Sequence, residues 1–277
     1  MVKIAHCTDF SENSKKALET ILFNFWSFDI TIDILHLVED SNDKAEEKLK
    51  LYKEELLISH SNSVTFSTYL FKSDQKMDLL KKLNTGDYFT TVVGLEGTQK
   101  RAGIGSFLEE LYKSYFNNLT IIPFQHEIKI ENKGLVALEF KNLETLYVLV
   151  KISHFLSFQF AKLSILIRVE EPLSDVQLKE VTELIKKVVP SIQFELLVCD
   201  HQHSSKYILE IVDGKKLDYC FILKDDFFDS FVYNLIKNKT DESTFHESLI
   251  RVSTTAEEVL KIKNDGNSVN RLDLKPQ

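Results

Sequence analysis

Three glycines and a serine near residue 100 are residue types that can bind phosphate. They are Gly94, Gly97, Gly105 and Ser106. Glycines let backbone N–H groups approach a phosphate closely, and a Gly-Ser pair that opens a helix adds the positive end of the helix dipole. These residues therefore predict an anion-binding loop. The alternative is that Gly94 and Gly97 turn the chain after a strand, and that Gly105 and Ser106 cap a helix.

A carboxylate follows the first apolar run of the chain. Asp9 lies in the segment from Ala5 to Ser14, and it could either meet a polar ligand or cap the following helix, a role worth about 1 kcal/mol. Cys7, just before it, is either a reactive thiol or a small buried residue. His6 and His36 lie in apolar runs, so we expect them to make local hydrogen bonds.

Other candidate groups are weaker. His201 and His203 form a His-x-His pair without a HExxH motif or an acidic companion, so a solvated loop is favoured over a metal site. No Ser/His/Asp or Cys/His group has a recognisable order. We therefore predict no catalytic residues, no metal ligands and no enzyme activity beyond incidental slow ATP hydrolysis.

Strands and helices alternate along the first half and must position these residues. Predicted strands are Lys3–Cys7, Thr31–Val38, Val64–Phe71, Tyr88–Gly94 and Leu119–Pro123. Predicted helices between them are Ser11–Trp26, Asp43–Ser59, Gln75–Leu83 and Gly105–Phe116.

The second half repeats this order, with matching strands about 130 residues later. Its predicted strands are Leu135–Phe140, Leu163–Val169, Ile192–Cys199, Leu217–Leu223 and Ser248–Val252. An internal duplication explains this pattern. It predicts an α/β protein of two tandem doubly wound domains, at 1–126 and 134–253, followed by a helix and polar tail at 254–277. Each domain would be a parallel sheet covered by helices, with ligands at the carboxyl ends of its strands.

Composition excludes several classes of partner. The chain has 277 residues, a net charge of −8 and a pI near 5.6, which disfavours binding to nucleic acid or anionic lipid. No apolar run is long enough for a membrane span, and no signal peptide is evident, so we predict a cytoplasmic protein. Three widely spaced cysteines, Cys7, Cys199 and Cys220, predict reduced, mostly buried thiols.

The segment Ala5-His6-Cys7-Thr8-Asp9-Phe10-Ser11 closely resembles the opening of universal stress proteins, and the resemblance extends through Leu35 to Val38 and through Val92 to Pro123. It covers the whole first half and, more weakly, the second. It implies a five-stranded sheet of the adenine nucleotide alpha hydrolase-like type in each domain, with strand order 3-2-1-4-5. It also implies an intrachain pseudo-dimer of the two domains, and it makes a further homodimer plausible.

The family's nucleotide-binding members have Gly, two residues, Gly, nine residues, then Gly followed by Ser or Thr. Here only seven residues separate Gly97 from Gly105. The resemblance implies that ATP or AMP, with or without Mg²⁺, binds through Thr8, Asp9, Val38, Val93, Gly94, Gly97, Gly105, Ser106 and Phe107. Glu96 would repel a nearby phosphate and Leu108 replaces a usual hydroxyl, whereas Lys100 and Arg101 could offset that charge. We expect a weakened site or one for a smaller adenine nucleotide.

The second half has lost these features. Glu139 stands in register with Asp9, and the loop from Lys224 to Asp229 has three carboxylates, two phenylalanines and no glycine. We therefore predict a stress-response protein whose first domain senses an adenine nucleotide and whose second serves structure or an unidentified protein partner. The alternative is an interaction module that binds no nucleotide.

Overall fold

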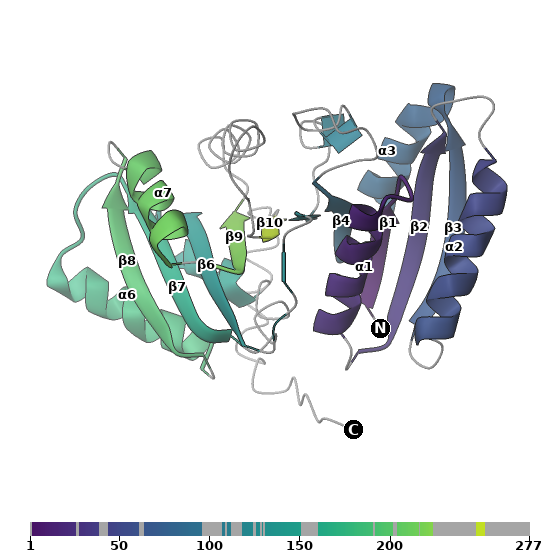
Figure 1. The fold of residues 1–277 in the computed structure, drawn as a ribbon. Coiled ribbons are helices and arrows are strands. Elements are labelled where there is room, and N and C mark those ends of the chain that lie inside the picture. Colours follow the sequence, from purple (N-terminus) through teal and green to yellow (C-terminus); the bar gives the residue numbers. More distant parts are fainter. Residues whose placement is uncertain are drawn as a thin grey trace. The chain divides into compact units, whose positions relative to one another are not determined.

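The computed structural model describes residues 2–25, 28–38, 44–60, 64–95, 107–108, 110–111, 118–123, 126–127, 129, 131–150, 160–190, 192–201, 204–215, 217–223 and 248–252. These residues form two compact units (Figure 1). The first contains the described residues up to Glu127, and the second contains those from Lys129 to Leu223. The division falls within strand β10 (Ser248–Val252), which is therefore described with neither unit.

Five parallel strands form the sheet of the first unit. They are β1 (Val2–Cys7), β2 (Ile30–Val38), β3 (Val64–Lys72), β4 (Thr90–Gly94) and β5 (Leu119–Ile122). Their order is β3-β2-β1-β4-β5, which confirms the predicted order 3-2-1-4-5. The central strands β1 and β4 are almost entirely buried, as expected for a parallel sheet covered on both faces.

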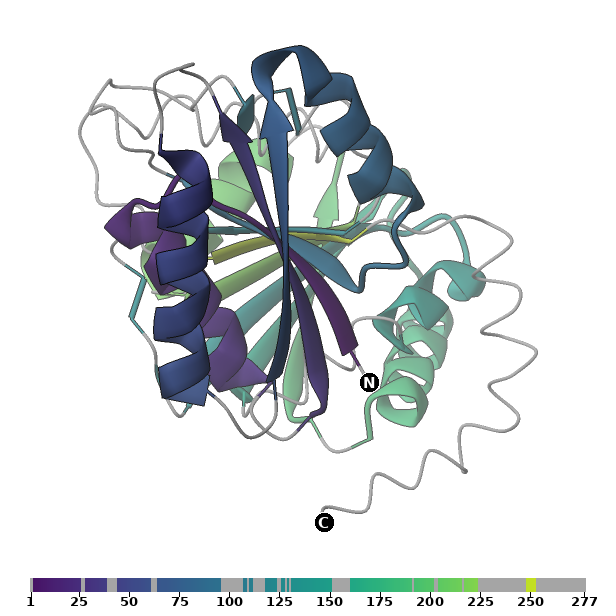
Figure 2. The same ribbon diagram turned by 90° about the vertical axis from the view of Figure 1, so that its right-hand side faces the viewer.

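Helices cover both faces of this sheet. Figure 2 shows α1 (Glu12–Asn24) and α2 (Ala45–His60) on one side and α3 (Lys76–Thr85) on the other. Right-handed crossovers explain this placement, because the chain moves outward from β1 to β3 and then returns past β1 to β4. A 3-10 turn, η1 (Ser73–Gln75), precedes α3. Of the fourth predicted helix, the described residues Phe107, Leu108, Glu110 and Leu111 are helical.

The second unit has a four-stranded parallel sheet. Its strands are β6 (Asn132–Glu139), β7 (Phe160–Val169), β8 (Phe194–Asp200) and β9 (Tyr219–Leu223), in the order β9-β6-β7-β8. This order matches β4-β1-β2-β3 of the first unit. The fifth strand predicted for this half is β10, with the predicted bounds.

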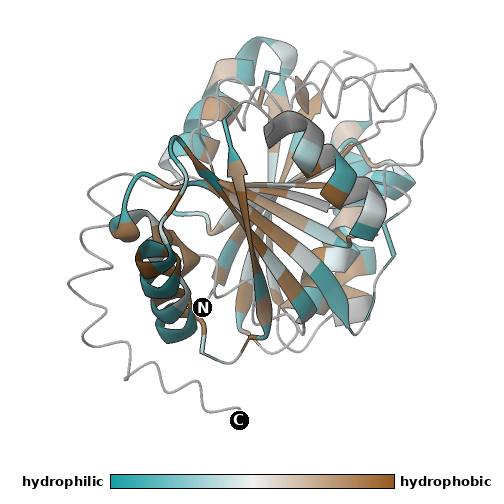
Figure 3. Ribbon diagram, turned by 90° about the vertical axis from the view of Figure 1, so that its left-hand side faces the viewer, coloured by the Kyte–Doolittle hydropathy of each residue, from teal (hydrophilic) through white to brown (hydrophobic). Residues whose placement is uncertain are grey.

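Three helical elements accompany this sheet: η2 (Leu143–Tyr147), α6 (Asp175–Val188) and α7 (Ser204–Lys215). In Figure 3 the strands of this unit are mainly apolar, and α6 has one apolar and one polar side. Its buried residues Val181 and Ile185 are four apart, on one helix face. No helix in the described parts of the chain is long and apolar enough to cross a membrane.

Equivalent strands pair in the same register within each of the two sheets. In the first unit, the Phe89 N–H donates to the Lys3 carbonyl oxygen at 2.7 Å, and in the second, the Asp218 N–H donates to the Lys133 carbonyl oxygen at 2.9 Å. Lys133 follows Lys3 by 130 residues, and Glu139 follows Asp9 by the same interval. However, β1 ends at Cys7 whereas β6 continues to Glu139. The central strand of the first sheet therefore ends two residues earlier than its equivalent in the second sheet.

Candidate functional site

The carboxyl ends of β1 and β4 form the switch point of the first sheet, because β2 and β4 lie on opposite sides of β1. Ligands of doubly wound folds bind at such a point. Thr8 and Asp9 follow β1 here, and Val93 and Gly94 end β4. Val38 ends β2 at the same edge of the sheet. Gly97, Gly105 and Ser106, together with the charged residues Glu96, Lys100 and Arg101, lie outside the described residues.

Asp9 orders the start of α1 without capping it. Its Oδ1 accepts hydrogen bonds from the Ser11 backbone N–H at 3.0 Å and from the Ser11 hydroxyl at 2.6 Å. Ser11 is the N-cap, and its hydroxyl oxygen accepts from the Ser14 N–H at 3.1 Å. The alternative that Asp9 itself caps the helix was wrong, because the cap lies two residues later. Asp9 instead holds the capping residue in place.

Phe10 has a left-handed backbone, with φ of 61°. For a residue with a Cβ this conformation costs on the order of 1–2 kcal/mol. Two kinds of contact offset that cost. The Phe10 N–H donates to the Thr8 hydroxyl oxygen at 3.0 Å, and the Phe10 ring lies 4.3 Å from the His36 ring and 5.8 Å from the Tyr52 ring, centroid to centroid. The turn that carries Asp9 is therefore tightly held.

A buried polar network lies under this turn. The His6 Nε2 lies 3.2 Å from the Tyr52 hydroxyl and 3.3 Å from the Ser14 hydroxyl, and the Ser14 hydroxyl donates to Thr8 Oγ1 at 2.8 Å. Burial lowers the pKa of His6 to about 4, so its ring is neutral near pH 7. His36 Nδ1 lies 2.7 Å from the Thr8 carbonyl oxygen. The local hydrogen bonds predicted for both histidines are confirmed.

The three cysteines are buried and form no disulfide, as predicted. Burial raises the pKa of Cys7 to about 12 and that of Cys199 to about 11. Little thiolate is then present at neutral pH, which argues against a reactive thiol at Cys7.

Gly94 has a packing role of its own. A Cβ at this position would lie 2.9 Å from Asn13 Nδ2 and 3.2 Å from the Asn13 backbone carbon, so only glycine lets β4 and α1 approach this closely. Leu95 and Leu108 are buried, and Phe107 is half-buried in a helical turn. These side chains continue the apolar core next to the predicted phosphate loop.

Solved structures of universal stress proteins share this architecture. One from Archaeoglobus fulgidus is 15% identical, with 92% of this chain and 97% of that chain covered and a TM-score of 0.61. A second, from Pseudomonas aeruginosa, is 11% identical, with 96% and 97% covered and the same TM-score. The chain has the universal stress protein fold. No family model and no curated protein matches the sequence.

The universal stress protein fold does not by itself decide the function. The cytoplasmic domain of a prokaryotic cation chloride cotransporter matches 94% of this chain and 98% of its own, with 12% identity and a TM-score of 0.51. The function of this chain therefore depends on its own site residues.

In the second unit, an ion pair lies at the position that corresponds to the Asp9 turn. Glu139 Oε2 lies 3.1 Å from Arg168 Nη1, and both side chains are largely buried. Glu139 pairs with Arg168 in the register of β6 and β7, whereas Asp9 lies beyond the end of β1. Sequence reasoning missed this ion pair. The sequence does offer one signal. Arg168 begins the segment Arg168-Val169-Glu170-Glu171, whereas the matching segment of the first half begins with Leu37. Residues 224–229, the predicted acidic loop, lie outside the described part.

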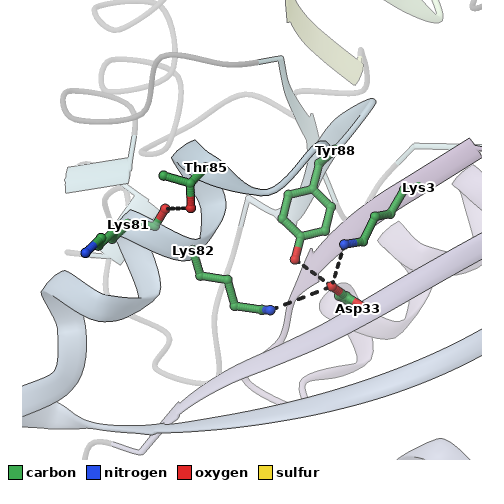
Figure 4. Close-up of polar contacts among 6 residues, drawn as sticks. All are labelled: Lys3, Asp33, Lys81, Lys82, Thr85 and Tyr88. Atoms are coloured by element: carbon green, nitrogen blue, oxygen red, sulfur yellow. Dashed lines mark hydrogen bonds and ion pairs between the residues drawn. The ribbon is translucent and has the colours of Figure 1, made fainter.

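A second polar cluster, also missed from the sequence, lies on the α3 side of the first sheet (Figure 4). Asp33 is buried within β2, where its Oδ2 accepts from the Tyr88 hydroxyl at 2.6 Å and lies 3.4 Å from Lys3 Nζ and 3.9 Å from Lys82 Nζ. Burial, reinforced by Asp33, raises the pKa of Tyr88. Lys81, next in the chain to Lys82, points away. The cluster joins the end of α3 to the sheet.

The second unit has a cluster of similar composition on β7, β8 and the end of α7. Glu195 of β8 contacts Lys215 at the end of α7, lies 3.2 Å from Lys162 Nζ, and accepts from the Ser164 hydroxyl at 2.6 Å. Glu195 is about a third exposed, whereas Asp33 is buried. Among the described residues, no three His, Cys, Asp or Glu side chains could hold a metal ion. His203 lies outside them.

Proposed function

We propose that this chain is a universal-stress-type stress-response protein whose first unit binds an adenine nucleotide, ATP or AMP, at the carboxyl edge of β1 and β4. The observation that carries the proposal is the Asp9 turn. A carboxylate held by two hydrogen bonds from Ser11 lies at the switch point, at the same edge of the sheet as the glycine that ends β4.

In this proposal Asp9 meets the ribose or phosphate region, and the backbone at Val38 lies near the base. The glycines after β4 would bring backbone N–H groups to the phosphates, with Gly105 and Ser106 opening the next helix. Mg²⁺ would accompany a triphosphate and neutralise part of its charge. Bound nucleotide would change the affinity of this unit for a protein partner.

The second unit would bind no nucleotide. Glu139, at the position of Asp9, is already paired with Arg168 inside the sheet. A carboxylate paired in this way would not accept a hydrogen bond from a ribose hydroxyl. This unit would instead contribute structure or a surface for a protein partner.

Thermal unfolding with and without millimolar ATP, AMP and Mg²⁺ tests the proposal, since a ligand at 100 times its Kd stabilises the native state by about 2.7 kcal/mol. We expect an upward shift in Tm for the wild type and for Asp87→Ala, which removes an exposed carboxylate just before β4, at the opposite edge of the sheet. Asp9→Asn, which keeps an acceptor for Ser11, should lose most of the shift relative to its own unliganded Tm. No shift in the wild type with any adenine nucleotide would reject the proposal and favour the interaction module.

A further inference from the structure

Tyr52 of α2 contacts both structures that support the Asp9 turn. Its ring meets the edge of Phe10 at 5.8 Å, and its hydroxyl lies 3.2 Å from His6 Nε2. The ring is also stacked on His6 at 6.2 Å. Tyr52 is buried although it belongs to a helix with many charged residues. Tyr52 thus connects α2 to the turn.

His6 Nε2 connects Tyr52 to the residues under the turn. It contacts both the Tyr52 and the Ser14 hydroxyls, and the Ser14 hydroxyl donates its one proton to Thr8 Oγ1. The His6 ring is neutral near pH 7 because burial lowers its pKa. Burial raises the pKa of Tyr52, which keeps the phenol protonated. The Tyr52 hydroxyl therefore fixes the His6 ring against which Ser14 and Thr8 are arranged.

The network acts on Asp9 through Thr8 and Phe10. Thr8 Oγ1 accepts the Phe10 N–H, which holds Phe10 in its left-handed conformation. Because Phe10 directly follows Asp9, this strained backbone sets the direction of the turn and hence the position of the Asp9 carboxylate. Such strain persists only where surrounding contacts maintain it.

We propose that Tyr52 is a positioning residue for the Asp9 turn, and that it acts through the His6–Ser14–Thr8 network and the Phe10 ring. The inference rests on the proposed nucleotide site, and it adds α2 to the parts of the fold that determine affinity. Tyr52 itself touches no nucleotide in this arrangement.

The test compares Tyr52→Phe with Tyr88→Phe. Each variant removes one phenol hydroxyl that makes a hydrogen bond within the first unit, but Tyr88 bonds to Asp33, away from the turn. Calorimetric titration with ATP and AMP should show affinity about five- to tenfold weaker in Tyr52→Phe, because one net hydrogen bond is lost, and unchanged in Tyr88→Phe. Equal affinities for wild type and Tyr52→Phe would overturn the inference.

Amide hydrogen exchange without nucleotide separates this inference from the proposed function. Tyr52→Phe should speed exchange at the Phe10, Ser11 and Ser14 amides, and Tyr88→Phe should not. If the wild type binds no nucleotide, the proposed function fails, and exchange at these three amides alone decides whether Tyr52 holds the turn. Exchange identical to that of the wild type would reject the positioning role even if binding is found.

Discussion

The two units use the same strand order and register but differ at one position of their central strands. In the first unit the chain leaves β1 before Asp9, whose carboxylate is held by Ser11 at the sheet edge. In the second, β6 continues through Glu139, whose carboxylate is neutralised by Arg168. The position equivalent to Asp9 can thus belong to the sheet while the fold is kept. Extending the strand by two residues and supplying a buried partner for the carboxylate is sufficient.

The largest expected effect is that of Glu139→Ala. The variant leaves the Arg168 guanidinium buried without its carboxylate, which costs about 3–5 kcal/mol. Urea unfolding followed by circular dichroism should show a lower midpoint for the second unit. Replacing both residues by leucine should restore most of the stability, because both charged groups are then removed. An unchanged midpoint in Glu139→Ala would show that the ion pair does not matter for stability.

The next effect is a pH dependence that belongs to the first unit. The pKa of His6 falls from its ordinary 6.5 to about 4 on folding, so below pH 6.5 the unfolded state binds a proton that the folded state does not. Stability should therefore be full above pH 6.5 and fall by about 3 kcal/mol as the pH drops toward 4. His6→Val, which copies Val136 of the second unit, should flatten the profile. A wild-type profile equally flat between pH 6.5 and 4 would contradict this assignment.

Burial should determine how much each acidic cluster contributes to the free energy of unfolding. Asp33→Asn removes a buried carboxylate that accepts the Tyr88 hydroxyl, with an expected loss of about 2 kcal/mol. Glu195→Gln changes a carboxylate that is about a third exposed, so its loss should stay within about 1 kcal/mol and shrink in high salt. Denaturant midpoints measured at two ionic strengths compare the two variants. Equal losses would mean that burial does not separate the clusters.

The smallest effects should have opposite signs at two glycines. Gly94→Ala places a Cβ against Asn13 and should cost about 1–2 kcal/mol. Gly214→Ala, in α7, meets no heavy atom within 4 Å and should stabilise the chain by about 0.5–1 kcal/mol. Thermal unfolding of both variants tests the pair. A stabilised Gly94→Ala would show that β4 and α1 can separate without cost.

The strands were predictable because each is an apolar run bounded by polar turns, and a parallel sheet buries such runs on both faces. Ser248–Val252 was found in this way from five residues alone. The side-chain partners were not predictable. Asp9 and Ser11 are both good helix caps by type, and only geometry shows which one caps.

Contacts between residues that are far apart in the sequence were also not predictable. Lys and Glu form two exposed ion pairs at α2, Lys44–Glu47 and Lys50–Glu54. The buried stripe of this helix brings Tyr52 to His6, which lies 46 residues earlier in the chain. No local pattern links two such residues, because the link depends on how the helix is rotated against the sheet.

The tight contact between Gly94 and Asn13 also bears on how such chains change over generations. Selection for a well-packed α1 is sufficient to retain this glycine, whether or not the protein binds a nucleotide. A glycine at the end of the fourth strand is therefore no evidence by itself that a chain of this fold binds a ligand.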